Sequence, residues 1–326
     1  MSNALSLNKA QIQKISLRHP YLFVLLLLII VLGINFYVQP NLFEPRILSG
    51  NLRIFLPLMI VTAGQAIVIM GGGIDLSVGA IVSMVNAILV TLITRESTGA
   101  EIVFAIAVGV GSGMAAGAFN GLCVAYLRLQ PIVTTYATSF VFAGIALWVL
   151  PRPGGALPSE LTRLYRQNPL EIPLAIWVAA LLILFWVGLR ATRYGRYLFA
   201  VGGQPAAAYA TGVPVNLVRA STYVIAGLTS ALGALGLTLS TGSGDPRIGL
   251  EMTLSSIVAV VLGGTRLSGG QGGIAGSVMG VIILGSIRNI ISFANVPTWW
   301  QTLVDALIII GALAGPGLVR LLWRRK

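Results

Sequence analysis

Apolar runs long enough to cross a lipid bilayer follow one another along almost the whole chain, and this pattern restricts the fold more than any other feature. Of the 326 residues, 56% are hydrophobic and only 9% are charged, whereas soluble domains carry about 25% charged residues. A helical span needs about 20 mainly apolar residues. We therefore expect an all-α polytopic membrane protein with about ten transmembrane helices, some of them broken or re-entrant. The candidate spans are 20–39, 54–71, 79–94, 102–126, 132–150, 173–190, 220–240, 252–264, 273–288 and 300–318, of which the third, eighth and ninth are short or interrupted by glycine.

The basic residues predict how the chain sits in its membrane. Lys and Arg concentrate in cytoplasmic loops, and with the amino terminus in the cytoplasm most of the 21 Lys and Arg fall inside and most of the 9 acidic residues outside. We expect a cytoplasmic tail at 1–19, one transmembrane domain at 20–318 with a cytoplasmic loop at 190–219, and a cytoplasmic tail at 319–326. The charge of +12 then reflects topology and contact with acidic membrane lipid, not nucleic acid.

The segment MGGGIDLSVGA, residues 70–80, ends one apolar run and begins another. Irregular backbone at membrane depth persists only where protein or a water-filled cavity covers it, and broken helices of this kind line transport pathways. Asp75 inside the break contacts a transported solute or gate, or else Asp75 or Ser77 caps the next helix. Both roles can hold at once.

A second glycine-rich stretch, GGTRLSGG at 263–270, shares the pattern G-G-x-x-L-S-x-G with GGIDLSVG at 72–79. Transporters are often built from two related halves with matching interrupted segments at the pathway. Between the two stretches, glycine recurs at every fourth position from Gly109 to Gly121 and predicts close helix packing within the bundle. Asn120 lies beside this ridge and needs a polar partner. The candidate pathway or gate residues are Gly72, Gly73, Asp75, Ser77, Gly79, Asn120, Gly263, Gly264 and Ser268.

The letters LSGGQ at 267–271 are also the signature of the ATP-hydrolysing subunits of ABC transporters. Such a subunit needs a phosphate loop, G-x-x-x-x-G-K-[ST], but none of the three lysines, Lys9, Lys14 and Lys326, follows a glycine. We therefore interpret LSGGQ as a backbone break and expect no ATP hydrolysis by this chain. The sequence also lacks a Ser-His pair, an HExxH motif and a carboxylate dyad, so we assign no catalytic or metal-ligating residue. Cys123 is the lone cysteine and forms no disulfide framework.

Within the basic loop 190–219, QPAAAYATG begins with proline, continues with helix formers and stops at glycine. These are helix start and stop signals, and they predict a short helix outside the bilayer. Its exposed face is mostly alanine, too weakly apolar to anchor in lipid, so a groove of a partner protein suits it better. The residues assigned to this contact are Gln204, Ala206, Ala207, Ala210 and Gly212.

From about residue 50 to 315 the sequence resembles the ribose-type membrane permeases of ABC sugar importers. The resemblance rests on GGGIDLSVG, GAFNGLCVAYLRLQPIVTT, TRYGRYLFAVGGQPAAAYATGVPV and VAVVLGGTRLSGGQGGIAGSVMGVIILG. It implies a multi-pass protein of the bacterial inner membrane that passes a monosaccharide, such as a pentose or hexose. It also implies a second permease subunit, separate ATPase subunits that bind the ATP, a periplasmic binding protein and no cofactor in this chain. The helix at 204–213 would then be the coupling helix that receives the ATPase stroke.

The sequence departs from this family's pattern at three positions. Gln204 replaces a frequent asparagine, and Thr253 and Ser255 stand where the family often has glutamate and aspartate. These departures leave the solute open, so a permease for a non-sugar polar solute such as a nucleoside, polyol or furanone signal remains an alternative. A proton-coupled secondary transporter using Asp75 or Asp305 is the second alternative.

Overall fold

The described chain is mainly helical. The structure, a computed structural model, describes residues 20–294 together with 297, 300, 303, 306, 307 and 310. The expected tails, Asp305 and most of the run 300–318 lie outside these residues. No strand occurs in the described part, which confirms the all-α prediction. The helices are α2 (Pro20–Val38), α3 (Pro45–Met70), α4 (Val78–Leu92), α5 (Gly99–Ala125), α6 (Pro131–Val149), α7 (Ser159–Arg166), η1 (Pro169–Glu171), α8 (Leu174–Ala191), α9 (Arg193–Gly203), α10 (Pro205–Ala210), α11 (Val215–Thr241), α12 (Met252–Leu262) and α13 (Ile274–Phe293).

Six of the described helices are long and apolar enough to cross a membrane: α3, α5, α6, α8, α11 and α13. Shorter apolar helices occur at 24–38, 78–92 and 252–262, so the short apolar helices expected at 79–94 and 252–264 are present. The ninth predicted span is not short, because α13 has 20 residues and runs to Phe293. The polytopic membrane architecture is therefore shown.

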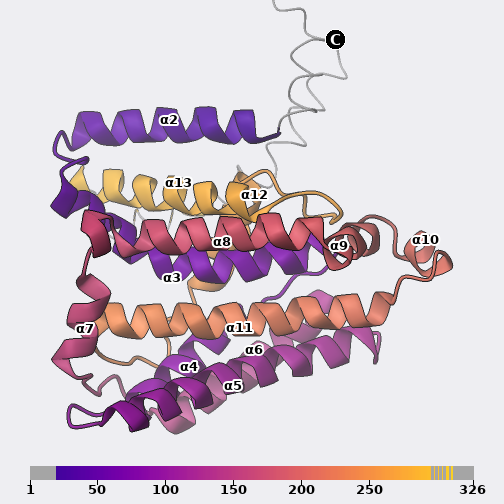
Figure 1. Cartoon of the computed structure of the whole chain (residues 1–326), viewed down its shortest axis with the longest axis horizontal. Coiled ribbons are helices and arrows are strands. Elements are labelled where there is room, and N and C mark those ends of the chain that lie inside the picture. Colours follow the sequence, from indigo (N-terminus) through magenta and orange to yellow (C-terminus); the bar gives the residue numbers. More distant parts are fainter. Residues whose placement is uncertain are drawn as a thin grey trace, which may run out of the picture.

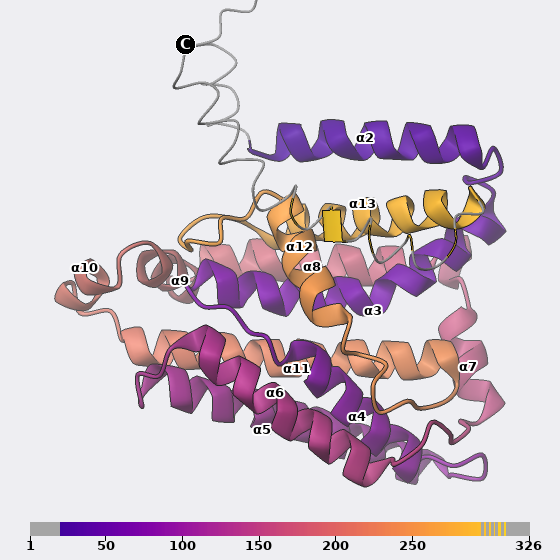
Figure 2. The same cartoon turned by 180° about the vertical axis from the view of Figure 1, so that it is seen from behind.

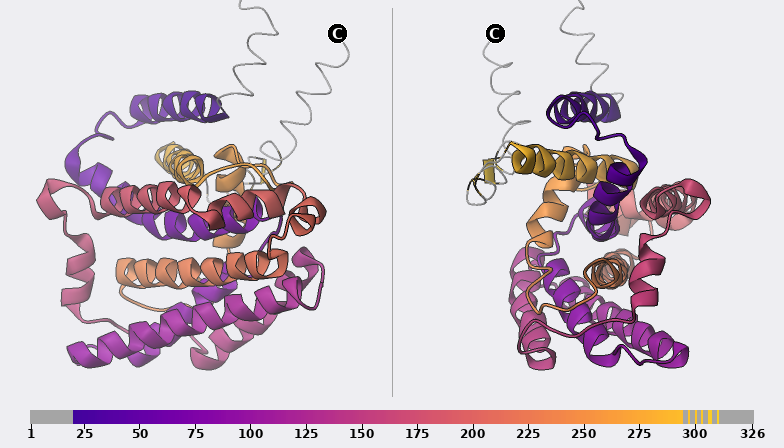
Figure 3. Two further views of the ribbon diagram at one scale, coloured as in Figure 1. Left: turned by 45° about the vertical axis from the view of Figure 1, so that its right-hand side comes forward. Right: turned by 90° about the vertical axis from the view of Figure 1, so that its left-hand side faces the viewer.

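The long helices run back and forth between two ends of the molecule (Figure 1). The turns α2–α3 and α4–α5 lie with α7 at one end, here called the α7 end. The turn α5–α6 lies with α9 and α10 at the other, the α10 end. Seen from behind, α12 runs steeply across the layers that the long helices form (Figure 2). In the right-hand view of Figure 3, α11 is seen end-on near the middle of the molecule, in agreement with its packing on both α5 and α3.

Three features at the helix ends differ from the sequence prediction. Helix α3 begins at Pro45 instead of residue 54, because its polar first turns are hydrogen-bonded to α7 and to the segment after it. There Ser49 Oγ donates to Asn168 Oδ1 (2.8 Å), and Tyr165 donates to the Arg53 carbonyl (3.0 Å). Burial raises the pKa of the Tyr165 phenol and keeps it a donor. The sequence prediction also missed α7, and the loop expected at 190–219 is largely helical because α9 precedes α10.

The predicted glycine ridge on α5 packs within the chain. A Cβ on Gly117 would overlap the Tyr223 carbonyl of α11, and one on Gly121 would lie 2.7 Å from the Ala220 carbonyl oxygen. Small residues let two helix backbones approach this closely. The tight α5–α11 pair, with the almost fully buried α4 beside it, forms the frame around the first helix break.

Candidate functional site

The two helix breaks begin with the same backbone turn. At the end of α3, Gly72 has φ +83°, its N–H donates to the Ile69 carbonyl (2.9 Å) and the Gly73 N–H donates to the Val68 carbonyl (3.0 Å). This pair of bonds with a left-handed residue is the Schellman motif, which satisfies carbonyls left over at a helix end. Glycine fits here because a left-handed residue without a Cβ is not strained.

The end of α12 repeats this turn. Gly264 also has φ +83°, its N–H donates to the Val261 carbonyl (2.9 Å), and the Thr265 N–H donates to the Val260 carbonyl (3.2 Å). Gly264 is therefore the structural counterpart of Gly72. The letter pattern G-G-x-x-L-S-x-G instead aligns Gly72 with Gly263 and is wrong by one residue. The repeat that the sequence suggested exists in the turns, but the residues that follow each turn do not correspond.

After the first turn the chain has no regular secondary structure, and Asp75 is completely buried within it. Its Oδ1 accepts from the Ser77 backbone N–H (2.8 Å) and from Ser77 Oγ (2.7 Å). Ser77 occupies the N-cap position of α4 but makes no side-chain cap bond. In the first turn, the Gly79 N–H bonds instead to Thr253 Oγ1 (3.1 Å). Asp75 therefore fixes the backbone just before α4, and a side chain from the start of α12 supports the helix itself.

Ser77 continues into a buried chain of hydrogen bonds that joins three helices. Asn120 Nδ2 of α5 donates to Ser77 Oγ (2.7 Å), and Thr138 Oγ1 of α6 donates to Asn120 Oδ1 (2.7 Å). Thr135 Oγ1 accepts from the Leu76 N–H (2.9 Å) and donates to the Pro131 carbonyl (2.9 Å). We call Asp75, Ser77, Asn120, Thr135 and Thr138 the polar network. The expected polar partners of Asn120 are therefore Ser77 and Thr138.

Thr135 and Thr138 were not predicted as site residues, and Thr253 was noted only as a departure from the family's pattern. Thr135 and Thr138 lie in the predicted span 132–150, where their helical spacing was a usable signal. Two buried oxygens near the network, Asp75 Oδ2 and the Tyr223 hydroxyl, have no hydrogen-bond partner among the described residues. Hydroxyl, amide and carboxylate groups of this kind recognise other hydroxyl groups by hydrogen bonding.

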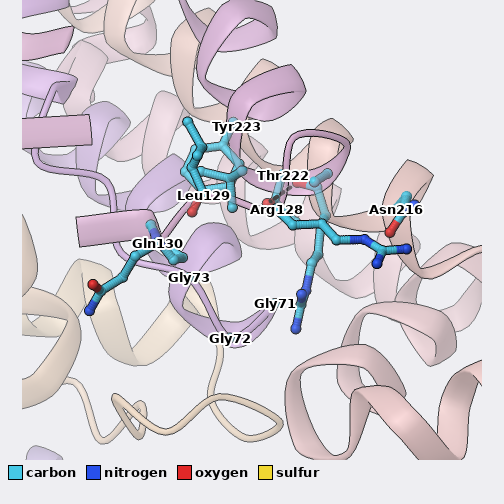
Figure 4. Close-up of a pocket in the computed structure, with 13 residues that line it drawn as sticks. Gly71, Gly72, Gly73, Arg128, Leu129, Gln130, Asn216, Thr222 and Tyr223 are labelled. Carbon is cyan, nitrogen blue, oxygen red and sulfur yellow. Dashed lines mark hydrogen bonds between the residues drawn. The ribbon is translucent and has the colours of Figure 1, made fainter. Parts of the chain in front are cut away.

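The first turn also forms one wall of a cavity of about 400 Å³ at the α10 end. Figure 4 shows Gly71, Gly72 and Gly73 on one side of it, with Arg128, Gln130 and Asn216 around them. Arg128 has φ +56°, an uncommon conformation for a residue with a side chain. Arg128, Gln130 and Asn216 are exposed, so the cavity is reached from the α10 end.

The second break, LSGGQ included, lies at the same end. The Gly270 N–H donates to the Met70 carbonyl at the end of α3 (3.0 Å), and Gly269 and Gly270 have φ +81° and +71°. Ser268 is exposed, and Gly263 packs against Gly276 of α13. Gly263 and Ser268, both predicted as pathway or gate residues, therefore do not join the polar network, whereas Gly72, Gly73 and Gly79 flank it.

The predicted short helix is present as α10, with Pro205 at its first position and Gly212 beyond its end at φ +81°. Gln204 lies between α9 and α10 and is exposed. On α10, Ala206, Ala207 and Ala210 are exposed, while Ala208 is buried against Val201, Val213 and Val218. Tyr209, which the sequence analysis did not single out, is 75% exposed. Helix α10 thus presents a small apolar face with one aromatic ring.

Comparison with known proteins shows what the chain is similar to. Residues 47–313 match the family described as branched-chain amino acid transport system / permease component. The ribose import permease protein RbsC of Bacillus subtilis (strain 168) is 35% identical over 298 residues, which cover 90% of each chain. The L-arabinose ABC transporter permease protein AraH of Azospirillum brasilense is 32% identical over 84% of this chain and 80% of the relative.

A third relative is the autoinducer 2 import system permease protein LsrD of Escherichia coli O9:H4 (strain HS). It is 29% identical over 85% of this chain and 86% of its own length. No solved structure matches the chain. These three relatives are named as transport permeases, and each is matched over most of its length.

Proposed function

The chain belongs to the family of branched-chain amino acid transport system permease components, and from this membership we propose that it is the translocation subunit of an ABC importer for a small sugar. ATP is bound and hydrolysed by a separate ATPase subunit, and a periplasmic binding protein delivers the sugar. One observation carries the proposal. The exposed helix α10 lies at the same end of the molecule as both helix breaks, where an ATPase subunit that binds it can act on them.

The sugar class rests on two observations. The relatives matched over most of their length are named for ribose, L-arabinose and autoinducer 2. The polar network holds buried hydroxyl and amide groups, and Asp75 Oδ2 and the Tyr223 hydroxyl have no partner among the described residues, a chemistry that suits a polyhydroxyl solute. The family description names branched-chain amino acids, but the 35% identity to a ribose permease over 90% of the chain favours a monosaccharide such as a pentose or hexose.

The proposal includes an orientation and an assembly. The α10 end faces the cytoplasm of a bacterium, both tails are cytoplasmic, and the protein resides in the inner membrane with a second permease subunit, identical or different. Basic residues support this orientation, since Arg193 and Arg196 lie in α9, while Arg190 lies at the end of α8 and Arg219 at the start of α11. The chain itself needs no cofactor.

The proton-coupled alternative requires a titrating relay at Asp75. The groups that bond to Asp75 and extend from it are those of Ser77, Asn120 and Thr138, none of which titrates near neutral pH. Asp305, the second acid of that alternative, lies outside the described residues. The family membership favours an ATP-driven importer.

The test places a bulky charge on α10. With Ala207→Glu we expect uptake to be abolished and co-purification of the ATPase subunit to weaken, because the exposed alanine face fits a groove that a glutamate does not. Membrane insertion should stay normal, since the side chain points to solvent. The matched control is Ala100→Glu, an exposed alanine at the start of α5 at the α7 end. Wild-type uptake and an intact complex in Ala207→Glu would contradict the proposal.

A further inference from the structure

Backbone segments from three distant parts of the chain meet at the α10 end without side chains between them. They are the turn after α3 at Gly72, the end of α9 at Gly202, and the LSGGQ loop at Gly269 and Gly270. We call this meeting point the glycine junction. The Met70 carbonyl, at the end of α3, accepts its hydrogen bond from the Gly270 N–H there.

The fit at the junction leaves no room for a methyl group at its centre. A Cβ on Gly202 would overlap the Met70 carbonyl oxygen and lie 2.7 Å from the Gly270 nitrogen. From the opposite side, a Cβ on Gly269 would lie 2.6 Å from the Gly202 carbonyl oxygen and 2.9 Å from Gly72 Cα. Real Cβ atoms do not approach backbone this closely, so Gly202 is wedged between the two breaks.

The junction connects the arm formed by α9 and α10 to the cavity and to the polar network. Gly71 and Gly72 are part of the cavity wall, and the chain continues from Gly73 through only one residue to Asp75. Close-packed interiors have low compressibility and transmit strain, so backbone segments packed in this way shift together from one arrangement to another. A displacement of α9 therefore moves the cavity wall and the LSGGQ loop together.

We propose that Gly202 is the positioning residue through which the α9–α10 arm moves both helix breaks as one body, and with them the Gly71–Gly73 wall of the cavity. The inference rests on the proposed function, since an ATPase subunit bound at α10 supplies the displacement. It assigns LSGGQ a role in this chain: its glycines let the second break follow the first. The cavity wall is then the inner gate of the pathway.

The experiment compares two neighbouring glycines on one helix. Gly202→Ala disturbs the centre of the junction, whereas a Cβ on Gly203 meets only Gly270 Cα, at 3.9 Å, so Gly203→Ala is the control. Each variant is assembled with its ATPase subunit and binding protein in proteoliposomes. For Gly202→Ala we expect uptake to fall by about tenfold or more while the complex stays intact and ATP hydrolysis continues. Gly203→Ala should behave as the wild type.

The outcomes separate this inference from the proposed function. Normal uptake in Gly202→Ala would overturn the relay but not the importer assignment, which Ala207→Glu tests. Loss of the ATPase subunit from the Gly202→Ala complex would also overturn the relay, because Gly202 would then only support the docking surface. A chain without any ATPase partner would overturn the proposed function itself.

A measurement on the wild-type complex covers the case in which Gly202→Ala does not fold. Hydrogen exchange is followed at 70–73, 196–204 and 266–272, before and after the ATPase is trapped with vanadate. If the junction moves as one body, the Gly270 amide, bonded to the Met70 carbonyl, stays protected in both states while exchange around the cavity changes. Loss of protection at Gly270 on trapping would mean that the junction opens, and would refute the relay.

Discussion

Replacing Asn120 by alanine removes the residue that joins α4 to α6 through the polar network. Asn120 receives one hydrogen bond from Thr138 and donates one to Ser77, both 2.7 Å long and both buried. Hydrogen bonds between membrane helices contribute on average about 0.6 kcal/mol and at most about 1.7 kcal/mol each. The loss of unfolding free energy within this range depends on whether Ser77 and Thr138 keep another hydrogen bond in the variant.

Neither partner is left without a bond in the Asn120→Ala variant. Ser77 Oγ still donates to Asp75 Oδ1 (2.7 Å), and Thr138 Oγ1 still reaches the Thr135 carbonyl (3.2 Å). The penalty for a stranded buried group, about 1–3 kcal/mol, is therefore largely avoided. With two average bonds lost and a small void left by the amide, we expect the free energy of unfolding to fall by about 1–2 kcal/mol.

A double-mutant cycle isolates the contribution of the bond itself. Asn120→Ala is combined with Thr138→Val, and the free energies of unfolding of the purified chain are measured in mixed micelles. We expect a coupling energy of about 0.6 kcal/mol. The control cycle combines Asn120→Ala with Ser112→Ala on the same helix, whose hydroxyl bonds only to the Gly109 carbonyl (2.8 Å). Equal coupling in the two cycles would refute the energetic role of the network.

Two further predictions test orientation and energy coupling. A reporter active only in the periplasm should be active when fused after Arg163 in α7 and silent when fused after Arg196 in α9, and the reverse pattern would overturn the proposed orientation. Asp75→Asn keeps an oxygen that accepts from Ser77 but removes the titrating group. We expect this variant to keep most of its uptake and that uptake to be insensitive to a protonophore. Proton coupling would be favoured if Asp75→Asn lost its uptake and a protonophore also stopped uptake by the wild type.

Hydropathy and helix signals predicted most of the fold because each depends on local sequence. The half-length helices α4 and α12 and the short helix α10 follow from run length, proline and glycine, and the structure contains all three. Helix α7 was missed because it is polar and only 8 residues long. The early start of α3 was missed because its first turns are polar and are held by contacts with Tyr165 and Asn168, more than 100 residues away.

The candidate site was predictable only where one residue marks it by itself. Asp75 is an acid in an apolar context, and Asn120 is an amide beside a glycine ridge, so both were found. The role of three threonines depends on tertiary packing. It places the Thr135 hydroxyl at the Leu76 N–H, the Thr138 hydroxyl at the Asn120 side-chain oxygen, and the Thr253 hydroxyl at the Gly79 N–H. Single threonines are common in membrane helices, where they bond to their own backbone, and the sequence does not distinguish those cases.

The LSGGQ letters illustrate how a short motif can arise from backbone geometry alone. Gly269 and Gly270 lie at positive φ and approach the backbones of Gly72 and Gly203, and either condition alone selects glycine. The serine of the motif is exposed, and the amide that matters is the Gly270 N–H, which satisfies a helix-end carbonyl. In an ATPase the same letters serve nucleotide chemistry, which requires a phosphate loop elsewhere in the chain. Here they let two distant backbones touch, so the motif has to be interpreted from its structural context and not from its letters.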